Sequence, residues 1–330
     1  MEQALAWSLE YDHATAVRLA AALGPWWILR GRAANADRNL RAATALADPG
    51  SHNWCRLEVL LGETAEYSSP ENAVAYYSAA CDAAAGGPSP ILADALNGRA
   101  HSLVNLFRLD EGAELARASL AMSRELGYLT GVASSLVVLG EAAFHAGRSD
   151  EALPWYRQAC QVDAAEIPGA LTRRCGLQLA NALRRVGDGE AALRTSADAL
   201  SQAMAADDVD AQVGAHILMA DLERQAGNVA AGAAHLRESL RLSRQTGSVF
   251  GLSDSLEICG HLCADRGRWA DAVSVWSAAT ALLRALGVSD TPLDLDARRA
   301  PWQKAAQVLG PVQLRSAEER GASMSTRCRS

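Results

Sequence analysis

The chain has 330 residues and a formal net charge of -7 at pH 7, so no overall positive field would draw it onto nucleic acid or an anionic membrane. We therefore expect neither a direct nucleic-acid partner nor a membrane partner. Its single lysine, Lys304, follows no glycine-rich segment, which excludes a phosphate-binding loop of the GxxxxGKS/T type.

Alanine and leucine are abundant and aromatic residues make up 5% of the chain, which favours helix over sheet almost everywhere. The seven cysteines show no CxxC pairing, which indicates reduced thiols and no zinc framework. The N-terminus lacks the basic and apolar stretches of a signal peptide. From these features we expect a cytoplasmic protein that holds no metal and no cofactor.

Residues 1–50 are expected to form an irregular opening of one or more helical hairpins. Helical patterns run from Leu5 to Arg30 and from Arg32 to Ala47. Trp26 and Trp27 lie near the end of the first pattern. Bulky aromatic side chains there are expected to bury the open end of the helical array.

One spacing, 40 residues, recurs from residue 51 to residue 287 and predicts six helical hairpins. In four of these hairpins a glycine at this spacing precedes the short turn between the two helices: Gly147, Gly187, Gly227 and Gly267. Phe107 and Tyr67 hold the equivalent positions of two earlier hairpins. A small residue follows five positions later: Ala152, Ala192, Gly232 and Ala272. A second series is expected to end the second helices in the left-handed conformation: Gly87, Gly127, Gly247 and Gly287.

Each hairpin is expected to pack small residues against large ones. The large residues predicted to fill the gaps between hairpins stand in one column of the second helices: Tyr76, Tyr156, Leu236 and Trp276. Ala116 and Ser196 interrupt that column, which predicts looser packing there. Beyond the hairpins, residues 288–320 are expected to form two capping helices, at 294–309 and 312–320. The polar residues 321–330 are expected to be a disordered tail.

The segment Leu139–Ala152, which reads LGEAAFHAGRSDEA, resembles the core of a tetratricopeptide repeat (TPR). The resemblance implies an all-α fold, a right-handed superhelical solenoid of TPR-like helical hairpins. A coiled coil is the rival all-helical interpretation, but a turn glycine every 40 residues interrupts any heptad pattern.

Both ends of the chain resemble the TPR region of actinobacterial signalling ATPases of the LuxR and antibiotic-regulatory types. The opening residues 4–10 read ALAWSLE, and residues 26–31 read WWILRG. Near the close, residues 282–287 read LLRALG and residues 321–325 read GASMS. In such regulators this region follows an ATPase switch and serves as a sensor or interaction arm, whereas this chain is expected to lack its own ATPase and DNA-binding modules.

The TPR resemblance also implies a concave groove lined by the first helix of each hairpin. Reading the repeat register along those helices gives a set of polar candidate ligand-binding residues: Asn97, His101, Asn105, Glu141, His145, Asn181, Arg184, Arg185, Asp221, Arg224, Gln225, Glu257 and His261. Our hypothesis is that an extended peptide or protein segment lies there, with the asparagines bonding its backbone and Arg184 or Arg185 meeting a carboxylate. The alternative, left open, is that these are ordinary solvated residues.

Two further combinations of residues invite a chemical interpretation. Cys259, His261 and Cys263 lie within five residues, but His261 is expected to point away and both thiols fall in packing columns. Glu141 and His145 stand four residues apart, but no third group is identifiable. Because no catalytic motif is present either, we do not expect an enzyme.

Three functions follow in order of preference. The first is a protein- or peptide-binding TPR sensor or scaffold module of a bacterial transcriptional regulator. The second is a stand-alone TPR adaptor unrelated to transcription. The third is a small-molecule-binding or enzymatic helical-repeat protein, so a small-molecule effector stays a second candidate partner beside the peptide.

Overall fold

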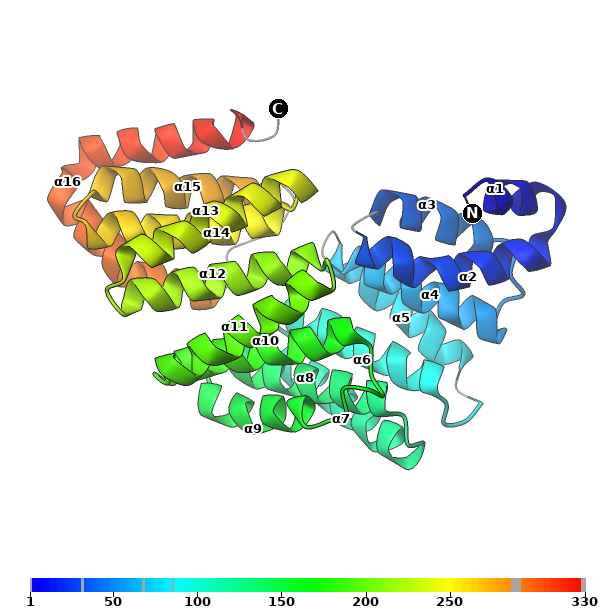
Figure 1. Cartoon of the computed structure of the whole chain (residues 1–330). Helices are drawn as coiled ribbons and strands as arrows, with labels where there is room; N and C mark the ends of the chain where they lie inside the picture. Colours follow the sequence, from blue (N-terminus) through cyan, green and yellow to red (C-terminus); the bar gives the residue numbers. More distant parts are fainter. Residues whose placement is uncertain (1, 31–32, 67–68, 85, 286–291, 328–330) are drawn as a thin grey trace. The chain divides into compact units, whose positions relative to one another are not determined.

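The computed structural model of the chain describes residues 2–30, 33–66, 69–84, 86–285 and 292–327, and all regular structure in these ranges is helical (Figure 1). No helix within the described ranges combines the length and apolarity needed to cross a membrane. The chain divides into two compact units, Met1–Gln178 and Leu179–Ser330, at a point inside α10, Gly169–Arg185. The all-helical repeat fold is the predicted fold class.

Unit 1 holds the first nine helices and the start of α10, and from α1 to α9 each helix packs on the next. The helix α6 also contacts α4 on one side and α8 on the other, so the three form a row within this unit. The nine helices are α1 Glu2–Tyr11, α2 His13–Leu29, α3 Ala33–Thr44, α4 His52–Ala65, α5 Pro70–Ala83, α6 Pro90–Asn105, α7 Leu109–Glu125, α8 Leu129–His145 and α9 Ser149–Cys160.

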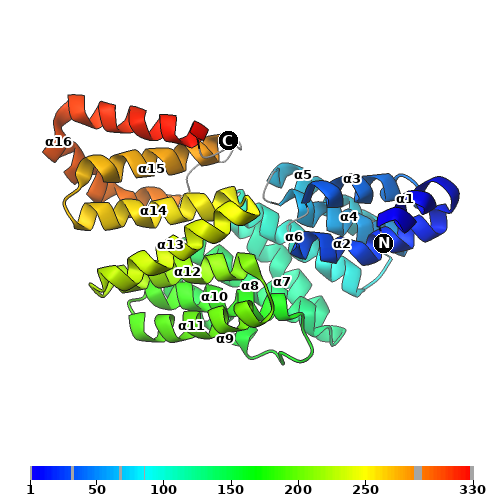
Figure 2. The same ribbon diagram turned by 45° about the horizontal axis from the view of Figure 1, so that its top comes forward.

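Unit 2 holds the end of α10 and the six helices that follow, each packed on its successor (Figure 2). Here α12 and α14 also contact one another. The six helices are α11 Gly189–Ala205, α12 Val209–Gln225, α13 Val229–Thr246, α14 Val249–Asp265, α15 Trp269–Arg284 and α16 Pro292–Arg327. Because the repeat spacing brings equivalent positions of α12 and α14 side by side, residues about 40 apart can meet.

Short side chains at the helix starts explain where several helices begin. Ser51, Ser89, Asp188, Asp208 and Ser248 each accept a hydrogen bond from the backbone N–H three residues further on. This N-cap bond satisfies one of the amides that the first turn of a helix leaves unpaired.

The turns between paired helices use the left-handed backbone region. The predicted turn glycines have φ between 70° and 87°, and those at 127 and 247 have φ of 65° and 72°. Gly87 has φ of 152°, and Gly287 lies outside the described residues. Two residues that are not glycine hold the same turn conformation, Phe107 at 58° and Asp207 at 53°.

Large aromatic side chains fill the spaces between hairpins, with one shift from the predicted column. Tyr156 and Trp276 are fully buried, and a Cβ on Gly140 or Gly260 would come within 2.5 Å of their rings. In α5, however, the buried residue is Tyr77 and not the predicted Tyr76. The α5 helix therefore stands one residue out of the 40-residue register, and Gly62 and Gly98 provide the close approach to the Tyr77 ring.

The two ends of the chain differ in part from expectation. Trp27 is fully buried, as predicted, but Trp26 is 38% exposed. At the other end, α16 breaks at Gly310, whose φ of 67° and ψ of 172° leave the helical region, and Pro311 follows. The predicted disordered tail is wrong for residues 321–327, which continue α16; residues 328–330 lie outside the described residues.

The end of α16 is ordered because it packs closely on α15. A Cβ on Gly321 would lie 2.1 Å from the backbone oxygen of Ser274, so only glycine allows this approach. The Ser274 hydroxyl also donates to the backbone oxygen of Ala317 at 2.9 Å. Polar composition alone did not reveal this contact.

Candidate functional site

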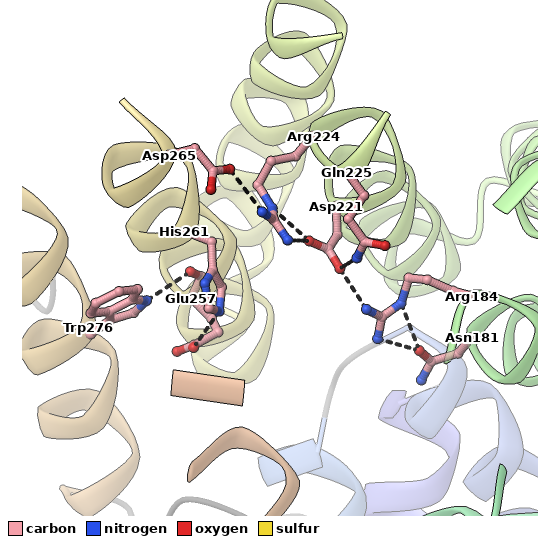
Figure 3. A network of polar contacts seen from close by, with 9 residues as sticks. All are labelled: Asn181, Arg184, Asp221, Arg224, Gln225, Glu257, His261, Asp265 and Trp276. Carbon is pink, nitrogen blue, oxygen red and sulfur yellow. Dashed lines mark hydrogen bonds and ion pairs between the residues drawn. The ribbon is translucent and has the colours of Figure 1, made fainter. Parts of the chain in front are cut away.

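A buried carboxylate, Asp221, forms the centre of a polar network in unit 2 (Figure 3). Arg184 donates from Nη1 to Asp221 Oδ2 at 2.6 Å, and Arg224 donates from Nε to Asp221 Oδ1 at 2.9 Å. Gln225 Nε2 donates to Asp221 Oδ2 at 2.8 Å. The side chain of Asp221 is 7% exposed, so these donors replace the water that a carboxylate would otherwise need.

The network continues to both sides of Asp221. Arg184 donates from Nη2 to Asn181 Oδ1 at 2.9 Å, within α10. Arg224 donates from Nη1 to Asp265 Oδ2 at 2.8 Å and so connects α12 to α14. Positive and negative side chains therefore alternate, and consecutive first helices contribute them.

Both arginines stay charged in this setting. Burial lowers the pKa of Arg184 and outweighs the opposing attraction of Asp221. For Arg224 burial acts in the same direction, but Asp221 and Asp265 together raise the pKa. A guanidinium begins so far above neutral pH that neither shift removes its charge.

A second group of polar side chains lies around Glu257 on α14. The buried Arg298 of α16 forms an ion pair from Nε to Glu257 Oε2 at 2.6 Å, and His261 Nε2 lies 3.3 Å from Glu257 Oε1. Trp276 Nε1 donates to the backbone oxygen of Glu257 at 3.2 Å, and the His261 ring packs edge-on against Trp276 (Figure 3). These contacts hold α14 to both helices that follow it.

Unit 1 has a different polar centre, the buried imidazole of His101 on α6. Its Nδ1 lies 3.1 Å from Glu66 Oε2, and its Nε2 lies 3.6 Å from Glu141 Oε2 on α8. Arg174 of α10 donates from Nη2 to Glu141 Oε1 at 2.9 Å. The Tyr77 hydroxyl donates to Glu66 Oε1 at 2.7 Å. Two carboxylates therefore share one imidazole and one guanidinium.

These partners set the charge states of the cluster. Burial opposes ionisation of Glu66 and Glu141, but His101 lowers the pKa of the first carboxyl and Arg174 that of the second. Burial also opposes the charged form of His101, yet attraction to Glu66 and Glu141 raises its pKa. Arg174 Nη2 also lies 3.0 Å from His101 Nε2 and acts to lower the pKa of the imidazole, so the ring contacts a guanidinium as well as both carboxylates.

In two neighbouring carboxyls, Glu63 on α4 and Asp94 on α6, the pKa is raised and not lowered. Burial raises the pKa of Glu63 to about 8, and repulsion from Glu66 and Asp94 adds to the shift. Burial raises the pKa of Asp94 to about 6, although Tyr128 donates a hydrogen bond to it at 2.9 Å. At neutral pH most Glu63 side chains therefore hold a proton.

The structure brings most of the sequence-predicted site residues into these contacts. In unit 1 they are His101 and Glu141. In unit 2 they are Asn181, Arg184, Asp221, Arg224, Gln225, Glu257 and His261. The sequence predicts that these residues line a groove and contact a ligand. In the structure they contact one another.

The remaining four candidates form none of the hydrogen bonds or ion pairs described above, although His145 lowers the pKa of Glu141 and Arg185 that of Arg184 through their charges. Asn97 is half-buried, and its Oδ1 has no hydrogen-bond partner among the described residues. His145 packs edge-on against Phe107, with ring centroids 5.7 Å apart. Asn105 is half-buried at the last position of α6, and Arg185 is exposed at the last position of α10.

Several network members escaped the sequence analysis. Glu66, Tyr77, Arg174, Gln178 and Arg298 stand outside the register columns that were read along the first helices. Gln178 donates to Glu141 Oε1 at 2.8 Å, four residues after Arg174 on the same helix. That i,i+4 pair of polar residues on α10 is the one signal that could have found two of them.

The thiol pair on α14 has no metal-binding arrangement in the described part of the chain. No group of three or more His, Cys, Asp or Glu side chains there could hold a metal ion. His261 contacts Glu257 and Trp276, whereas Cys259 and Cys263 hydrogen-bond one another. That bond raises the pKa of Cys259, which burial raises further, and lowers the pKa of Cys263.

Comparison with known proteins supports the repeat fold. A tetratricopeptide repeat family model matches residues 91–165, which span α6 to α9. No curated protein matches the chain.

Several solved structures are similar to most of the chain at low identity. A Rap protein complexed with competence and sporulation factor is 11% identical, with a TM-score of 0.60 over 95% of this chain and 96% of its own. Aspartyl phosphate phosphatase F from Bacillus subtilis is 11% identical, with a TM-score of 0.55 over 90% of this chain and 95% of its own. A tetratricopeptide repeat protein from Parabacteroides merdae is 14% identical, with a TM-score of 0.51 over 88% of this chain and 99% of its own. At these identities the likeness shows the fold alone, so the chain has a TPR-like helical-repeat fold, and a tetratricopeptide repeat region is supported over residues 91–165.

Proposed function

We propose that this chain is a regulatory interaction module that binds an extended peptide or protein segment along its first helices. The observation that carries the proposal is the alternating network of Arg184, Asp221, Arg224 and Asp265 in unit 2. Its members come from consecutive first helices, the elements that line the ligand groove in the TPR-type arrangement inferred from the sequence.

The two arginines retain donors for a ligand. A guanidinium has five N–H donors. Arg184 uses three of them, one each on Nε, Nη1 and Nη2, in its bonds to Asn181 and Asp221. Arg224 also uses one hydrogen on each nitrogen, in its contacts with Asp221 and Asp265. Within the described part of the chain, two donors therefore remain on each arginine for a peptide carbonyl or carboxylate.

Their fixed geometry favours binding. An arginine that is already held by carboxylates loses little side-chain freedom when a ligand arrives, so less of the interaction energy is spent on ordering. The side chains of Arg184 and Arg224 are 21% and 17% exposed, and that of Asp265 is 45% exposed, so solvent reaches the network. An extended segment with a carboxylate or free backbone carbonyls fits this donor set best.

The structural comparison gives supporting context. One solved structure of the same fold is, by its printed description, a complex with competence and sporulation factor, and 95% of this chain aligns with it. The end segments that resemble signalling ATPases add the regulatory setting, a transcriptional regulator acting in the cytoplasm. A stand-alone adaptor would use the same surface, and the test below applies to both roles.

A display library of random extended peptides selected against the whole chain tests the proposal. We expect enriched peptides to bind the native chain with a dissociation constant in the micromolar range or below, measured by fluorescence polarisation. Replacing both arginines, Arg184→Gln with Arg224→Gln, is expected to weaken binding about tenfold or more, because the carboxylate and carbonyl donors are lost.

The matched control removes two exposed arginines from second helices, Arg194→Gln with Arg241→Gln. Their partners Glu190 and Glu238 lie within the same helices, and the control changes the net charge equally. The proposal is wrong if the library yields no peptide, or if both double variants bind the selected peptides as the native chain does. Should Arg184→Gln with Arg224→Gln fail to fold, Arg184→Lys with Arg224→Lys keeps the charge and removes the planar donor fork.

A further inference from the structure

Two histidines of unit 2 meet between α12 and α13, the two helices of one hairpin. The Nδ1 atoms of His216 on α12 and His235 on α13 lie 3.0 Å apart. The ring centroids are 5.2 Å apart, and the ring planes are inclined by 40°. Both residues are half-buried, so solvent reaches them. Neither histidine belongs to the network around Asp221.

The two rings share one hydrogen bond, which an Nδ1–H of one imidazole donates to the Nδ1 lone pair of the other. A neutral imidazole carries its proton on either ring nitrogen. Transfer of this proton to Nε2 of the donating ring therefore leaves two Nδ1 lone pairs close together, without a change in charge. Neutral histidine is the commonest metal ligand of proteins.

The separation of the two nitrogens fits neighbouring ligands of one metal ion. Imidazole nitrogens bind a first-row divalent ion at about 2.0–2.1 Å. At that distance two nitrogens 3.0 Å apart form an angle of about 94° at the ion. This is near the angle of about 90° in square-planar or octahedral Cu²⁺ and Ni²⁺, whereas tetrahedral Zn²⁺ needs nitrogens about 3.3 Å apart. Because the rings approach edge to edge, each must turn about its Cβ–Cγ bond to aim its lone pair at the ion.

A carboxylate stands beside the two rings. Glu238 follows His235 by three residues on the same face of α13, and its charge acts on His216. Its partner is Arg241, whose Nε donates to Glu238 Oε2 at 3.0 Å. The two side chains of this ion pair are 41% and 57% exposed, and an exposed pair contributes little stability. Glu238 can therefore leave Arg241 and contact an ion held by the histidines.

We propose that His216 and His235 bind a divalent transition-metal ion, Ni²⁺ or Cu²⁺, through their Nδ1 atoms. Glu238 supplies the third protein ligand, and water fills the remaining positions. Within the described residues no three such side chains are already arranged around one point, so Glu238 joins the histidines only when the ion binds. Because the ion connects α12 to α13, its binding stabilises unit 2. The site is independent of the proposed peptide network.

Calorimetric titration of the whole, metal-free chain with Ni²⁺ at pH 7.5 tests the site, because at that pH an ordinary imidazole is mostly neutral. Ni²⁺ is the better probe, since Cu²⁺ oxidises thiols and the chain has seven cysteines. We expect a dissociation constant below about 100 μM. At a free Ni²⁺ concentration about 100 times that constant, the melting temperature should rise by at least about 3 °C.

The variant that tests the site is His216→Gln with His235→Gln, which removes both imidazoles and keeps a hydrogen-bonding amide at each position. We expect it to weaken Ni²⁺ binding at least about tenfold. The control, His13→Gln with His52→Gln, removes two exposed histidines of unit 1 and is expected to change affinity less than about twofold. If the double variant does not fold, the single variants His216→Gln and His235→Gln replace it.

Neighbouring side chains should change the affinity in opposite directions. Glu238→Gln should weaken Ni²⁺ binding about threefold, because a carboxylate ligand is lost. Arg241→Gln should strengthen it about threefold, because it frees Glu238 and removes a positive charge that acts on His216. Cys259→Ser with Cys263→Ser should leave the affinity at the native level, which separates this site from the thiol pair of α14.

Three results would overturn the proposal. The first is no binding of Ni²⁺ at about 1 mM. The second is native affinity in the His216/His235 variant, or an equal loss in the His13/His52 control. The third is Zn²⁺ binding as tightly as Ni²⁺, which contradicts the angle at the ion. Native affinity in Glu238→Gln would remove that residue from the site. Peptide binding by the metal-free His216/His235 variant should stay at the native level, which separates failure of this site from failure of the proposed peptide function.

Discussion

Both units bury polar side chains between the first helices of their hairpins, but the chemical groups differ. In unit 1 an imidazole, His101, lies between two carboxylates, and one of them, Glu66, in turn interacts with the carboxyl of Glu63 on α4. In unit 2 a carboxylate, Asp221, lies between two guanidinium groups. Groups that titrate near neutral pH are therefore concentrated in the first network, whereas the arginines of the second stay charged at any physiological pH. One repeat register can thus accommodate a pH-responsive centre and a pH-insensitive one.

Neutralising one buried carboxylate in each network should give the largest difference in the free energy of unfolding between the two units. Asp221→Asn leaves Arg184 and Arg224 facing each other without their shared counter-ion, so we expect a loss of about 3 kcal/mol in the free energy of unfolding. Glu141→Gln should cost about 1 kcal/mol, because the imidazole of His101 can be neutral and Arg174 is 38% exposed. Urea denaturation at pH 7 measures both values.

Glu190→Gln on the exposed face of α11 provides the control and should change the free energy by less than about 0.5 kcal/mol. If Glu141→Gln is as damaging as Asp221→Asn, the imidazole gives no relief and the two centres are equivalent.

A pH series on Glu63→Gln sharpens the contrast. The folded-state pKa of Glu63 is raised to about 8 from 4.5, so the folded protein binds a proton that the unfolded chain has lost. Stability from this group is present below about pH 4.5 and is lost as pH rises toward 8. Glu63→Gln should therefore stabilise the protein at pH 8.5, by about 2 kcal/mol after allowance for the partial exposure of the side chain, and change little at pH 5.

Denaturation curves of the native chain and the variant at both pH values provide the measurement. Glu114→Gln on α7, an exposed glutamate, serves as the matched control. An identical pH dependence in native and Glu63→Gln protein would show that Glu63 is ionised at neutral pH.

The turn residues test whether each unit tolerates the same backbone strain. Asp207 in unit 2 and Phe107 in unit 1 hold positive φ angles that glycine adopts without penalty. Asp207→Gly is expected to stabilise by about 1 kcal/mol. Phe107→Gly should gain less, because the ring packs against His145 at 5.7 Å. Thermal melting measures both; a destabilised Asp207→Gly would mean that contacts of the aspartate outweigh the strain.

The smallest effect is expected from a pair of histidines in unit 2, His216 and His235. Their Nδ1 atoms lie 3.0 Å apart, and burial lowers the pKa of both, with repulsion from His235 adding to the shift of His216. A depressed histidine pKa gives stability that is present above about pH 6.5 and is lost as pH falls through the folded-state value.

His216→Gln should reduce the fall in melting temperature between pH 7 and pH 5.5 by about 1–2 °C. His52→Gln at an exposed site on α4 should leave that difference unchanged. An unaltered pH dependence in His216→Gln would show that His216 does not contribute to the acid sensitivity.

Much of the fold could be read from the sequence because its determinants are local. Glycine at 147, 187, 227 and 267 is required where the backbone turns left-handed, and the small residues at 140 and 260 are required where an aromatic ring approaches. The 40-residue spacing also placed Asn181, Asp221 and Arg224 in register before any coordinates, and in the structure they share one network. The repeat periodicity determines which helices are neighbours, and neighbouring helices bring residues at equivalent repeat positions close together.

Tertiary structure alone decided which side chains meet inside those columns. A one-residue offset in α5 buried Tyr77 in place of Tyr76, against Gly62 of α4 and Gly98 of α6. Arg174 and Arg298 reach Glu141 and Glu257 on other helices because arginine side chains are long and flexible, so their partners follow from helix packing and not from spacing along the chain. Local sequence sets helices, caps and turns, whereas the pairing of buried charges depends on distances between helices that only the folded chain establishes.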